Sequence, residues 1–210
     1  MKITKYVHSC LLVETPDRVG IIDPGEYSWQ SDLLDITKLA RLDDIIITHE
    51  HIDHMCIPFI EALLLKFPAA TIFTTNAASV LLQKAGIKNV QTQGQDGVEL
   101  LKINHESTAP FGDAPENTGV HYLGQLTHPG DSQTFTESKP ILALPLTAPW
   151  GTLTKAAELG LALKPNYIIP IHDWHWNDTA RNDAYIRLEL FFKNHGISFI
   201  QMKDGNAVEL

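Results

Sequence analysis

Apolar residues along the chain fall into short runs that are separated by Pro, Gly, Asp and Asn. Short apolar or alternating runs predict strands, and apolar residues that recur every three or four positions predict helices. The expected strands are residues 2–7, 10–13, 19–22, 45–48, 71–74, 88–92, 98–104, 120–126, 141–144, 166–170 and 197–202. The expected helices are residues 31–42, 58–67, 76–85, 152–163 and 178–194. Each half of the chain begins with strands and continues with helix–strand units, which predicts two sheets with helices outside them.

Turn and cap residues mark the ends of several elements. Pro58 suits the first turn of its helix, and Pro68 ends that helix. Asn76 is the expected N-cap of the next helix, which Gly86 ends. Residues 107–118 are rich in Pro, Gly, Thr and Asn and predict a long loop, a feature that is often functional in compact domains.

The composition is that of an ordinary folded protein and excludes some classes of partner. A length of 210 residues fits a single domain over 1–210. The net charge of −9 argues against a nucleic acid or an anionic membrane as partner, so a small-molecule substrate is expected. The only two cysteines, Cys10 and Cys56, favour a reduced setting, and the N-terminus lacks the apolar region of a signal peptide. The expected location is the cytoplasm.

Four metal-capable side chains fall within six residues, directly after the apolar run 45–47, in the pattern His49-x-His51-x-Asp53-His54. Imidazole and carboxylate together suit Zn, Mn or Fe. In an extended segment His49 and His51 point to the same side, because side chains alternate with period two. Asp53 and His54 are adjacent and diverge unless the backbone turns. The pattern therefore predicts two ions, one held by His49 and His51 and a second held by Asp53 and His54.

Two ions need further ligands, and three other residues follow predicted strands in a similar way. His105 opens the long loop, His172 follows a strand, and Asp131 lies in a Pro-Gly turn where its two oxygens could bridge two ions. His121 and His128 compete with His105 for its place. His195, at a helix end, is better explained as a cation at the helix C-terminus.

These residues together make the sequence similar to a known family. The sequence resembles the metallo-β-lactamase superfamily across essentially its full length. The matching features are the motif at 49–54, His105, Asp131 within Gly130-Asp131-Ser132, and His172. The segments 8–14 and 20–25 look like a compact branch of metal-dependent hydrolases that is related to the ascorbate-6-phosphate lactonases.

The resemblance implies an α+β fold, a four-layer αβ/βα sandwich of the metallo-β-lactamase type, with the site at one edge of the two sheets. It assigns His49, His51 and His105 to one ion. It assigns Asp53, His54 and His172 to the other, with Asp131 as the bridge and Asp23 as a support for the ligands. Zn is the expected metal, with Mn or Fe as alternatives, and a homo-oligomer would fit the family.

The chemistry expected of such a site is hydrolysis. Two ions lower the pKa of a shared water from about 15.7 to roughly 7, which supplies hydroxide for attack on a carbonyl carbon or on phosphorus. Asp53 would bind metal and orient this nucleophile, while His175 and His128 are candidates for the proton donor. Trp150, Trp174 and Trp176 are expected either to line a ligand pocket or to pack the core or a subunit interface.

The expected function is hydrolysis of a small, anionic ester, lactone or phosphodiester. Two alternatives stay open. One is a mononuclear iron enzyme of sulfur metabolism, and the other is a non-catalytic binding protein with a vestigial metal site. The resemblance disfavours reduction of oxygen or nitric oxide, because flavodiiron members carry Glu where His51 stands.

Overall fold

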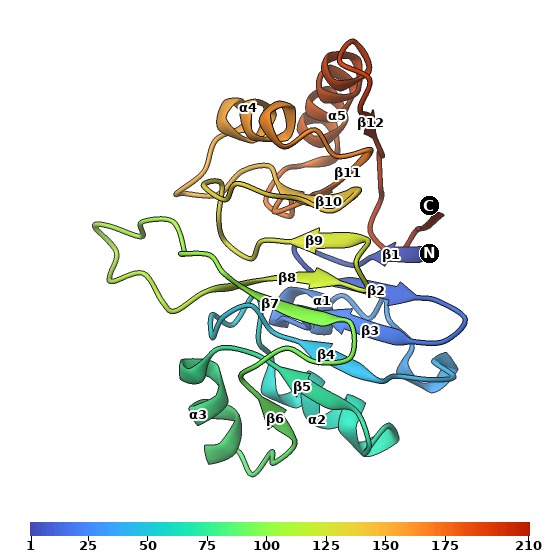
Figure 1. Cartoon of the computed structure of the whole chain (residues 1–210), viewed down its shortest axis with the longest axis vertical. Helices are drawn as coiled ribbons and strands as arrows, with labels where there is room; N and C mark the ends of the chain where they lie inside the picture. The colour runs from blue at the N-terminus through green and yellow to red at the C-terminus, as the bar shows by residue number, and fades with distance from the viewer. The chain divides into compact units, whose positions relative to one another are not determined.

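The computed structural model describes residues 1–210, which divide into two compact units. Unit 1 comprises residues 1–94 and 202–210, and unit 2 comprises residues 95–201. Each unit is built on one sheet (Figure 1). The expectation of a single domain over 1–210 depends on how the units associate and stays a prediction. No helix has the length and apolar character needed to span a membrane.

Unit 1 contains a seven-stranded sheet in the order β13-β1-β2-β3-β4-β5-β6. Its strands are β1 Lys2–Lys5, β2 Leu11–Glu14, β3 Val19–Ile22, β4 Asp44–Ile46, β5 Thr71–Phe73, β6 Val90–Gln91 and β13 Ala207–Glu209. β1, β2 and β3 pair antiparallel, whereas β3 to β6 pair parallel. Because two antiparallel pairings separate them, β1 runs in the same direction as β3 and β4.

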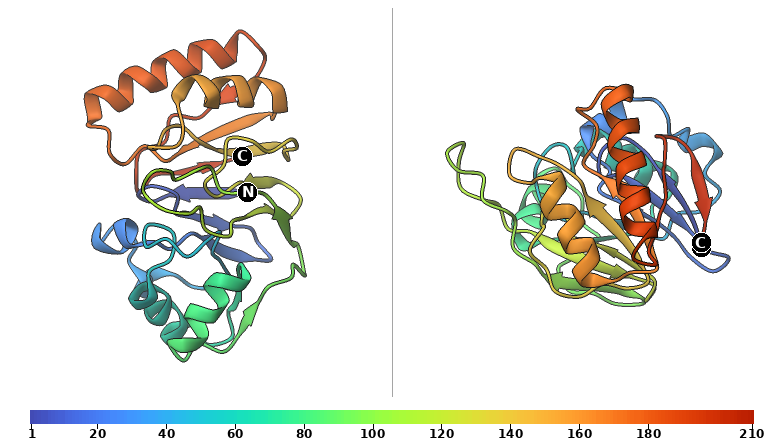
Figure 2. Two further views of the ribbon diagram at one scale, coloured as in Figure 1. Left: turned by 90° about the vertical axis from the view of Figure 1, so that its left-hand side faces the viewer. Right: turned by 90° about the horizontal axis from the view of Figure 1, so that it is seen from above.

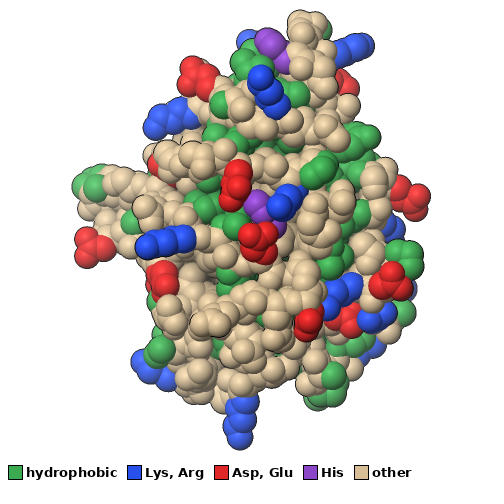
Figure 3. Space-filling view, in the orientation of Figure 1, with side chains coloured by type: hydrophobic (Ala, Val, Ile, Leu, Met, Phe, Trp, Pro, Cys, Tyr) green, Lys and Arg blue, Asp and Glu red, His purple; other side chains and the backbone are tan.

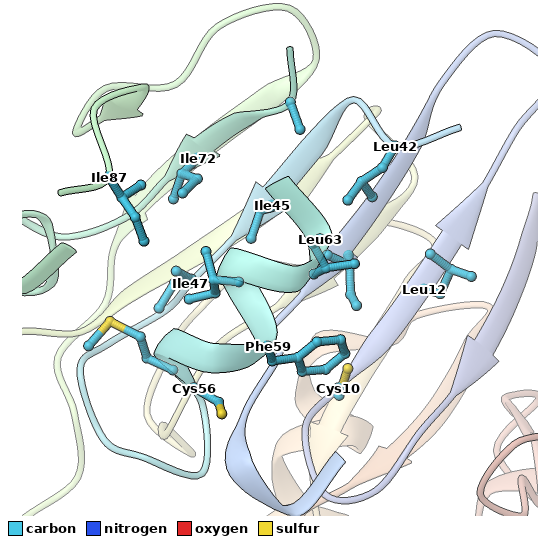
Figure 4. Close-up of a cluster of buried hydrophobic side chains, with 14 of the residues drawn as sticks. Cys10, Leu12, Leu42, Ile45, Ile47, Cys56, Phe59, Leu63, Ile72 and Ile87 are labelled. Atoms are coloured by element: carbon cyan, nitrogen blue, oxygen red, sulfur yellow. The ribbon is translucent and has the colours of Figure 1, made fainter. Parts of the chain in front are cut away.

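The helices of unit 1 are α1 Glu26–Gln30, α2 Ile57–Lys66 and α3 Asn76–Lys84, with a 3-10 turn η1 at Ile36–Lys38. α2 has proline in its first turn, as predicted, and buries Phe59, Ile60 and Leu63. Figure 4 shows Phe59 and Leu63 facing Leu12 and Ile45 of the sheet, in one apolar cluster. Burial of this helix face is the main hydrophobic contribution of α2 to the unit.

Unit 2 contains a six-stranded sheet in the order β12-β11-β10-β9-β8-β7. Its strands are β7 Val98–Lys102, β8 Thr118–Tyr122, β9 Leu126–His128, β10 Ile141–Pro145, β11 Tyr167–Ile171 and β12 Ser198–Phe199. The helices α4 Leu153–Leu163 and α5 Asp178–Lys193 lie on the same face of this sheet (Figure 2). Their core residues, which include Tyr185, Leu188 and Phe192 of α5, pack with Leu142 and Ile168 of the strands.

Two expectations about elements are wrong, and two elements were missed. The strand expected at 120–126 is a hairpin of β8 and β9, turning at Leu123 and Gly124, both with positive φ. The helix expected at 31–42 is only the turn η1, while α1 and β13 were not expected at all. Within 31–42, Lys66 Nζ donates to the backbone carbonyls of Ile36, Thr37 and Leu39. The other strands and helices match their predictions with shifted ends, most strongly at β6 and β12.

The direction of the strands decides where polar side chains gather. In unit 1 the carboxyl ends of β1, β3 and β4 lie at one edge of the sheet, and the next residues along the chain include His8, Asp23 and His49. In unit 2, β7, β9, β10 and β11 also run in one direction. Open α/β sheets bind ligands at the carboxyl ends of their strands. Each unit therefore presents its candidate ligands at such an edge.

Two surface features add to this description. The long loop predicted at 107–118 is irregular up to residue 117, and its Phe111 is 86% exposed. On the face drawn in Figure 3, acidic and basic side chains are interspersed rather than gathered into one basic patch.

Candidate metal-ligand clusters

The motif of unit 1 folds as a turn rather than as an extended segment, and the turn brings its imidazoles together. His49 Nε2 lies 3.1 Å from His51 Nδ1. The ring centroids of His49 and His54 are 4.0 Å apart. Two ring nitrogens at such a distance, beside a third imidazole, form the kind of donor cluster that Zn, Mn or Fe can use.

Asp53 extends this cluster to His8, a residue that sequence reasoning did not select as a ligand. Asp53 Oδ2 lies 3.1 Å from His8 Nε2 and 3.9 Å from His54 Nε2. The ring of Tyr27 meets the ring of His8 edge-on at 5.5 Å. Burial, followed by the negative charges of Asp53 and Glu26, raises the pKa of Tyr27. The Tyr27 phenol therefore stays protonated beside the cluster at neutral pH.

Asp23 and Thr48 fix which ring nitrogens face the cluster. Asp23 Oδ2 lies 2.7 Å from His54 Nδ1 and also accepts a hydrogen bond from the Thr48 hydroxyl. Because that hydroxyl proton is engaged, Thr48 Oγ1 can only accept from His49 Nδ1, 3.1 Å away. His49 and His54 are thus held with Nε2 as the nitrogen available to a metal.

Gly25 allows the segment after β3 to pack closely against the motif at 49–54. The backbone N–H of Glu26 donates to the Ile52 carbonyl, and that of Cys56 donates to the Pro24 carbonyl. A Cβ atom at Gly25 would lie 1.7 Å from the Asp53 carbonyl oxygen. Only glycine permits this approach, so Gly25 sets the position of Asp53 and His54.

In unit 2, Asp131 lies between two histidines. Asp131 Oδ1 is 2.8 Å from His172 Nε2, and Asp131 Oδ2 is 3.3 Å from His105 Nε2. His105 Nδ1 lies 2.6 Å from the Glu106 carbonyl oxygen, which can only accept, so that nitrogen carries a proton. The Nε2 atom of a neutral His105 ring therefore presents its lone pair toward Asp131.

Trp150 adds a contact that sequence reasoning missed. Its indole N–H donates to Asp131 Oδ2 over 3.1 Å. Its ring also meets the rings of His172 at 5.3 Å and His105 at 6.1 Å. The segment after His172 is fixed separately, because the buried Asp173 carboxylate accepts from the Tyr185 hydroxyl and lies 3.4 Å from Arg181 Nε.

The remaining candidates occupy different surroundings. His128 is buried on β9, and its Nδ1 accepts from the Gly130 N–H, so a proton on the neutral ring belongs to Nε2. His175 lies on the surface, and burial followed by the charge of His172 lowers its pKa. Trp174 is 41% exposed, while Trp176 packs against the core of unit 2. The catalytic roles expected of His128 and His175 stay predictions.

His195 and His121 are explained without a ligand. His195 Nδ1 lies 2.8 Å from the Phe191 carbonyl at the end of α5, as expected of a histidine at a helix C-terminus. His121 lies 3.3 Å from Glu99, and burial followed by the charge of Lys139 lowers its pKa.

Within each unit, the sequence-predicted ligands therefore form one group. Unit 1 gathers His49, His51, Asp53 and His54, and unit 2 gathers His105, Asp131 and His172. His8 could have been found from the sequence, because it follows a predicted strand just as His49 does. Trp150 was expected to line a ligand pocket or to pack the core or a subunit interface, but its hydrogen bond to Asp131 was not expected.

A family model matches most of the chain, and one relative matches nearly all of it. Residues 2–172 match the family described as beta-lactamase superfamily domain. Protein Rv0786c of Mycobacterium tuberculosis is 28% identical over 200 residues, which cover 90% of this chain and 91% of that protein.

Two solved structures share the fold. Igni18, a novel metallo hydrolase from Ignicoccus hospitalis, aligns with a TM-score of 0.70 at 21% identity, covering 99% of this chain and 97% of its own. The metallo-beta-lactamase fold protein YhfI from Bacillus subtilis aligns with a TM-score of 0.66 at 17% identity, covering 99% and 98%. This likeness confirms the expected fold class, an α+β fold of the metallo-β-lactamase type. Because the family match extends over most of the sequence, this chain belongs to the β-lactamase superfamily.

Proposed function

We propose that this protein is a metal-dependent hydrolase that uses two divalent ions to cleave a small, anionic ester, lactone or phosphodiester. Family membership and the likeness to a metallo hydrolase support the class of reaction. The donor chemistry of both units supports the metal. The acidic net charge of −9 supports a small molecule rather than a nucleic acid as substrate.

The arrangement of Asp131 carries the proposal. Its two carboxylate oxygens face two different histidine nitrogens, Oδ2 toward His105 and Oδ1 toward His172. A carboxylate that divides its oxygens in this way suits a bridge between two ions. A structural ion pair with one histidine would need only one of these contacts.

The donor set fits two ions of the Zn, Mn or Fe type, because it consists of imidazoles and carboxylates without a thiolate. The family resemblance implies that His49, His51 and His105 would hold one ion, and that Asp53, His54 and His172 would hold the other. Asp131 would contribute its carboxylate to both. Zn is the first candidate on chemical grounds.

Bound ions supply Lewis acidity and make water a nucleophile near neutral pH. The chain's own residues supply orientation and proton transfer. Asp23 holds the His54 ring through Nδ1, and the Glu106 carbonyl holds the His105 ring in the same way. Asp53 would bind metal and orient the attacking water. His128 Nε2–H and His175 are the candidate donors to the leaving group.

The local charge supports an anionic substrate. Two divalent ions carry about +4, against which Asp53 and Asp131 supply two negative charges. The site would therefore be cationic on an otherwise acidic protein. A phosphoester or a phosphorylated lactone matches that charge.

The test is a hydrolysis panel on full-length protein that has been stripped of metal and reloaded with Zn or Mn. A chromogenic phosphodiester, a lactone and a thioester are assayed beside a chelated sample and the His51→Ala variant. We expect turnover of one substrate class that is lost in both controls. His195→Ala is the matched histidine control and keeps its activity, because His195 is far from the ligands in sequence and bonds to the Phe191 carbonyl of α5.

Other outcomes separate the alternatives. One bound iron with oxygen consumption would support a mononuclear iron enzyme instead. Two bound metals without turnover across a broadened panel would favour a binding protein, and failure to bind metal would reject the proposal.

A further inference from the structure

Trp150 contacts all three candidate ligands of unit 2. Its indole N–H donates to Asp131 Oδ2 over 3.1 Å, the oxygen that also faces His105. The indole ring meets the His172 ring at 5.3 Å with an interplanar angle of 62° and the His105 ring at 6.1 Å with an angle of 68°. One side chain therefore limits the motion of a carboxylate and of the two imidazoles beside it.

The turn 148–151, which carries Trp150, is held in place by a clamp of hydrogen bonds, some within the turn and some from Gln133. The backbone groups of Ala148 and Gly151 bond to each other across the turn, with N···O distances of 3.1 and 3.5 Å. The side-chain amide of Gln133 donates to the carbonyls of Pro145 and Thr152, and its Oε1 accepts from the Thr152 N–H. Gln133 thus ties together both ends of the segment that carries Trp150.

Two further features show that this clamp is closely fitted. A Cβ atom at Gly151 would lie 3.1 Å from Cδ and Oε1 of Gln133, so glycine lets the amide lie against the turn. The Gln133 N–H donates to the Glu106 carboxylate, and the Glu106 N–H donates to the Asp131 carbonyl. The segments that carry His105, Asp131 and Trp150 are therefore joined by hydrogen bonds in one network.

We propose that Trp150 is a positioning residue for Asp131, and that it sets metal affinity by fixing the orientation of the carboxylate. A free aspartate side chain rotates about two bonds, which would move Oδ1 and Oδ2 away from their histidines. The indole N–H holds Oδ2 in place, so Oδ1 stays directed at His172 before any ion binds. This inference rests on the proposed function, because it takes Asp131 as a metal ligand.

The test compares Zn²⁺ affinity in the full chain, measured by competition with a chromophoric chelator, for the wild type and Trp150→Phe. Phenylalanine keeps an aromatic ring but removes the N–H donor together with part of the indole ring surface. Loss of a partner that orients a metal ligand typically weakens metal binding about 10- to 100-fold, which is the expected change. Trp29→Phe, a substitution in unit 1 where Trp29 packs on Phe59, is the matched control and keeps wild-type affinity.

A spectroscopic readout separates positioning from a general structural role. Protein labelled with ¹⁵N-tryptophan gives one indole N–H signal for each of its four tryptophans. The signal lost in Trp150→Phe identifies Trp150. In the metal-free wild type we expect that signal to show slow hydrogen exchange, and to shift more than the other three when Zn²⁺ is added.

The outcomes distinguish this inference from the proposed function. Wild-type protein that binds no metal overturns both. Metal binding by the wild type with unchanged affinity in Trp150→Phe, or a fast-exchanging Trp150 indole, overturns the inference alone. If Trp150→Phe does not fold, Gln133→Met releases the clamp while it keeps the indole, and the same loss of affinity is expected.

Discussion

Asp23 Oδ2 lies 2.7 Å from His54 Nδ1, so a carboxylate that follows β3 orients an imidazole that follows β4. The other oxygen of Asp23 accepts from the backbone N–H of Thr48 over 2.8 Å, which fixes the carboxylate in turn. Asp23 is fully buried. The ring of His54 is therefore oriented by the fold before any ion binds.

The first prediction concerns this contact. Asp23→Asn removes a charged acceptor from His54 Nδ1 and can present an N–H donor in its place, so the ring loses its fixed tautomer. We expect metal affinity to fall about 10- to 100-fold. The measurement is a competition titration with a chromophoric chelator. Asp35→Asn, at a carboxylate that caps only the surface turn η1, is the control and keeps full affinity. Equal affinities in all three proteins would show that Asp23 does not orient a ligand.

The second prediction concerns the close approach at Gly25. Gly25→Ala places a methyl group 1.7 Å from the Asp53 carbonyl oxygen, so either the motif or the segment after β3 must move. We expect a lower melting temperature together with loss of metal binding. Gly86→Ala is the comparison, because a methyl there meets no atom within 4 Å and strains only a backbone with φ of +87°. That variant should lose about 1–2 kcal/mol of stability, because an L-residue is strained at positive φ, and keep its metal affinity. A Gly25→Ala protein that binds metal normally would contradict the inference that Gly25 sets the position of Asp53 and His54.

The third prediction concerns the core of unit 1. Leu63 is fully buried on α2, whereas Leu65, two residues further along the same helix, is 88% exposed. Leu63→Ala removes buried methyl groups and leaves a cavity, which typically lowers the free energy of unfolding by about 2–5 kcal/mol. Leu65→Ala should change it by less than about 0.5 kcal/mol. Urea unfolding followed by circular dichroism measures both, and similar losses would place the packed face of α2 elsewhere.

The fourth prediction concerns alkaline pH. Burial, followed by electrostatic interactions with Cys10 and Glu14, raises the pKa of Tyr6 to about 12. Between pH about 10, the usual pKa of tyrosine, and about 12, the unfolded chain loses this phenolic proton while the folded chain keeps it. The stabilisation is therefore complete below the unfolded pKa and is lost as the pH rises through the folded pKa.

Tyr6→Phe removes this titration, so its free energy of unfolding should fall less steeply between pH 9 and pH 11 than that of the wild type. Urea unfolding at several pH values gives the two slopes, and the absorbance change of tyrosine ionisation provides an independent check. Parallel slopes would show that Tyr6 does not titrate in the way its burial requires.

Much of the candidate site could be predicted because its signals are local. His49, His51, Asp53 and His54 lie within six residues, and the turn that joins them brings the imidazoles together, although the prediction assumed an extended segment. His105, Asp131 and His172 follow β7, β9 and β11, and these three strands run in the same direction. Strand direction therefore gathers residues that are far apart in sequence.

Other features depend on contacts that no local pattern encodes. The segment 31–42 has a helical spacing but forms only the turn η1, and three of its carbonyls accept from the distant side chain of Lys66 on α2. Trp150 reaches Asp131 only because Gln133 and Glu106 bring separate loops together. β13 is short and partly exposed, so it lacks the apolar run by which strands are recognised.

The pairing of β13 with β1 has a consequence for synthesis on the ribosome. Unit 2 is a continuous stretch of chain and can fold as soon as residue 201 is available, whereas unit 1 still lacks its seventh strand at that point. Until residues 207–209 emerge, the backbone donors and acceptors along the outer side of β1 have no partner strand. A nascent chain stalled before these residues would expose the four-residue strand β1 as the edge of the sheet, whereas in the folded unit the shorter strand β13 takes the edge position.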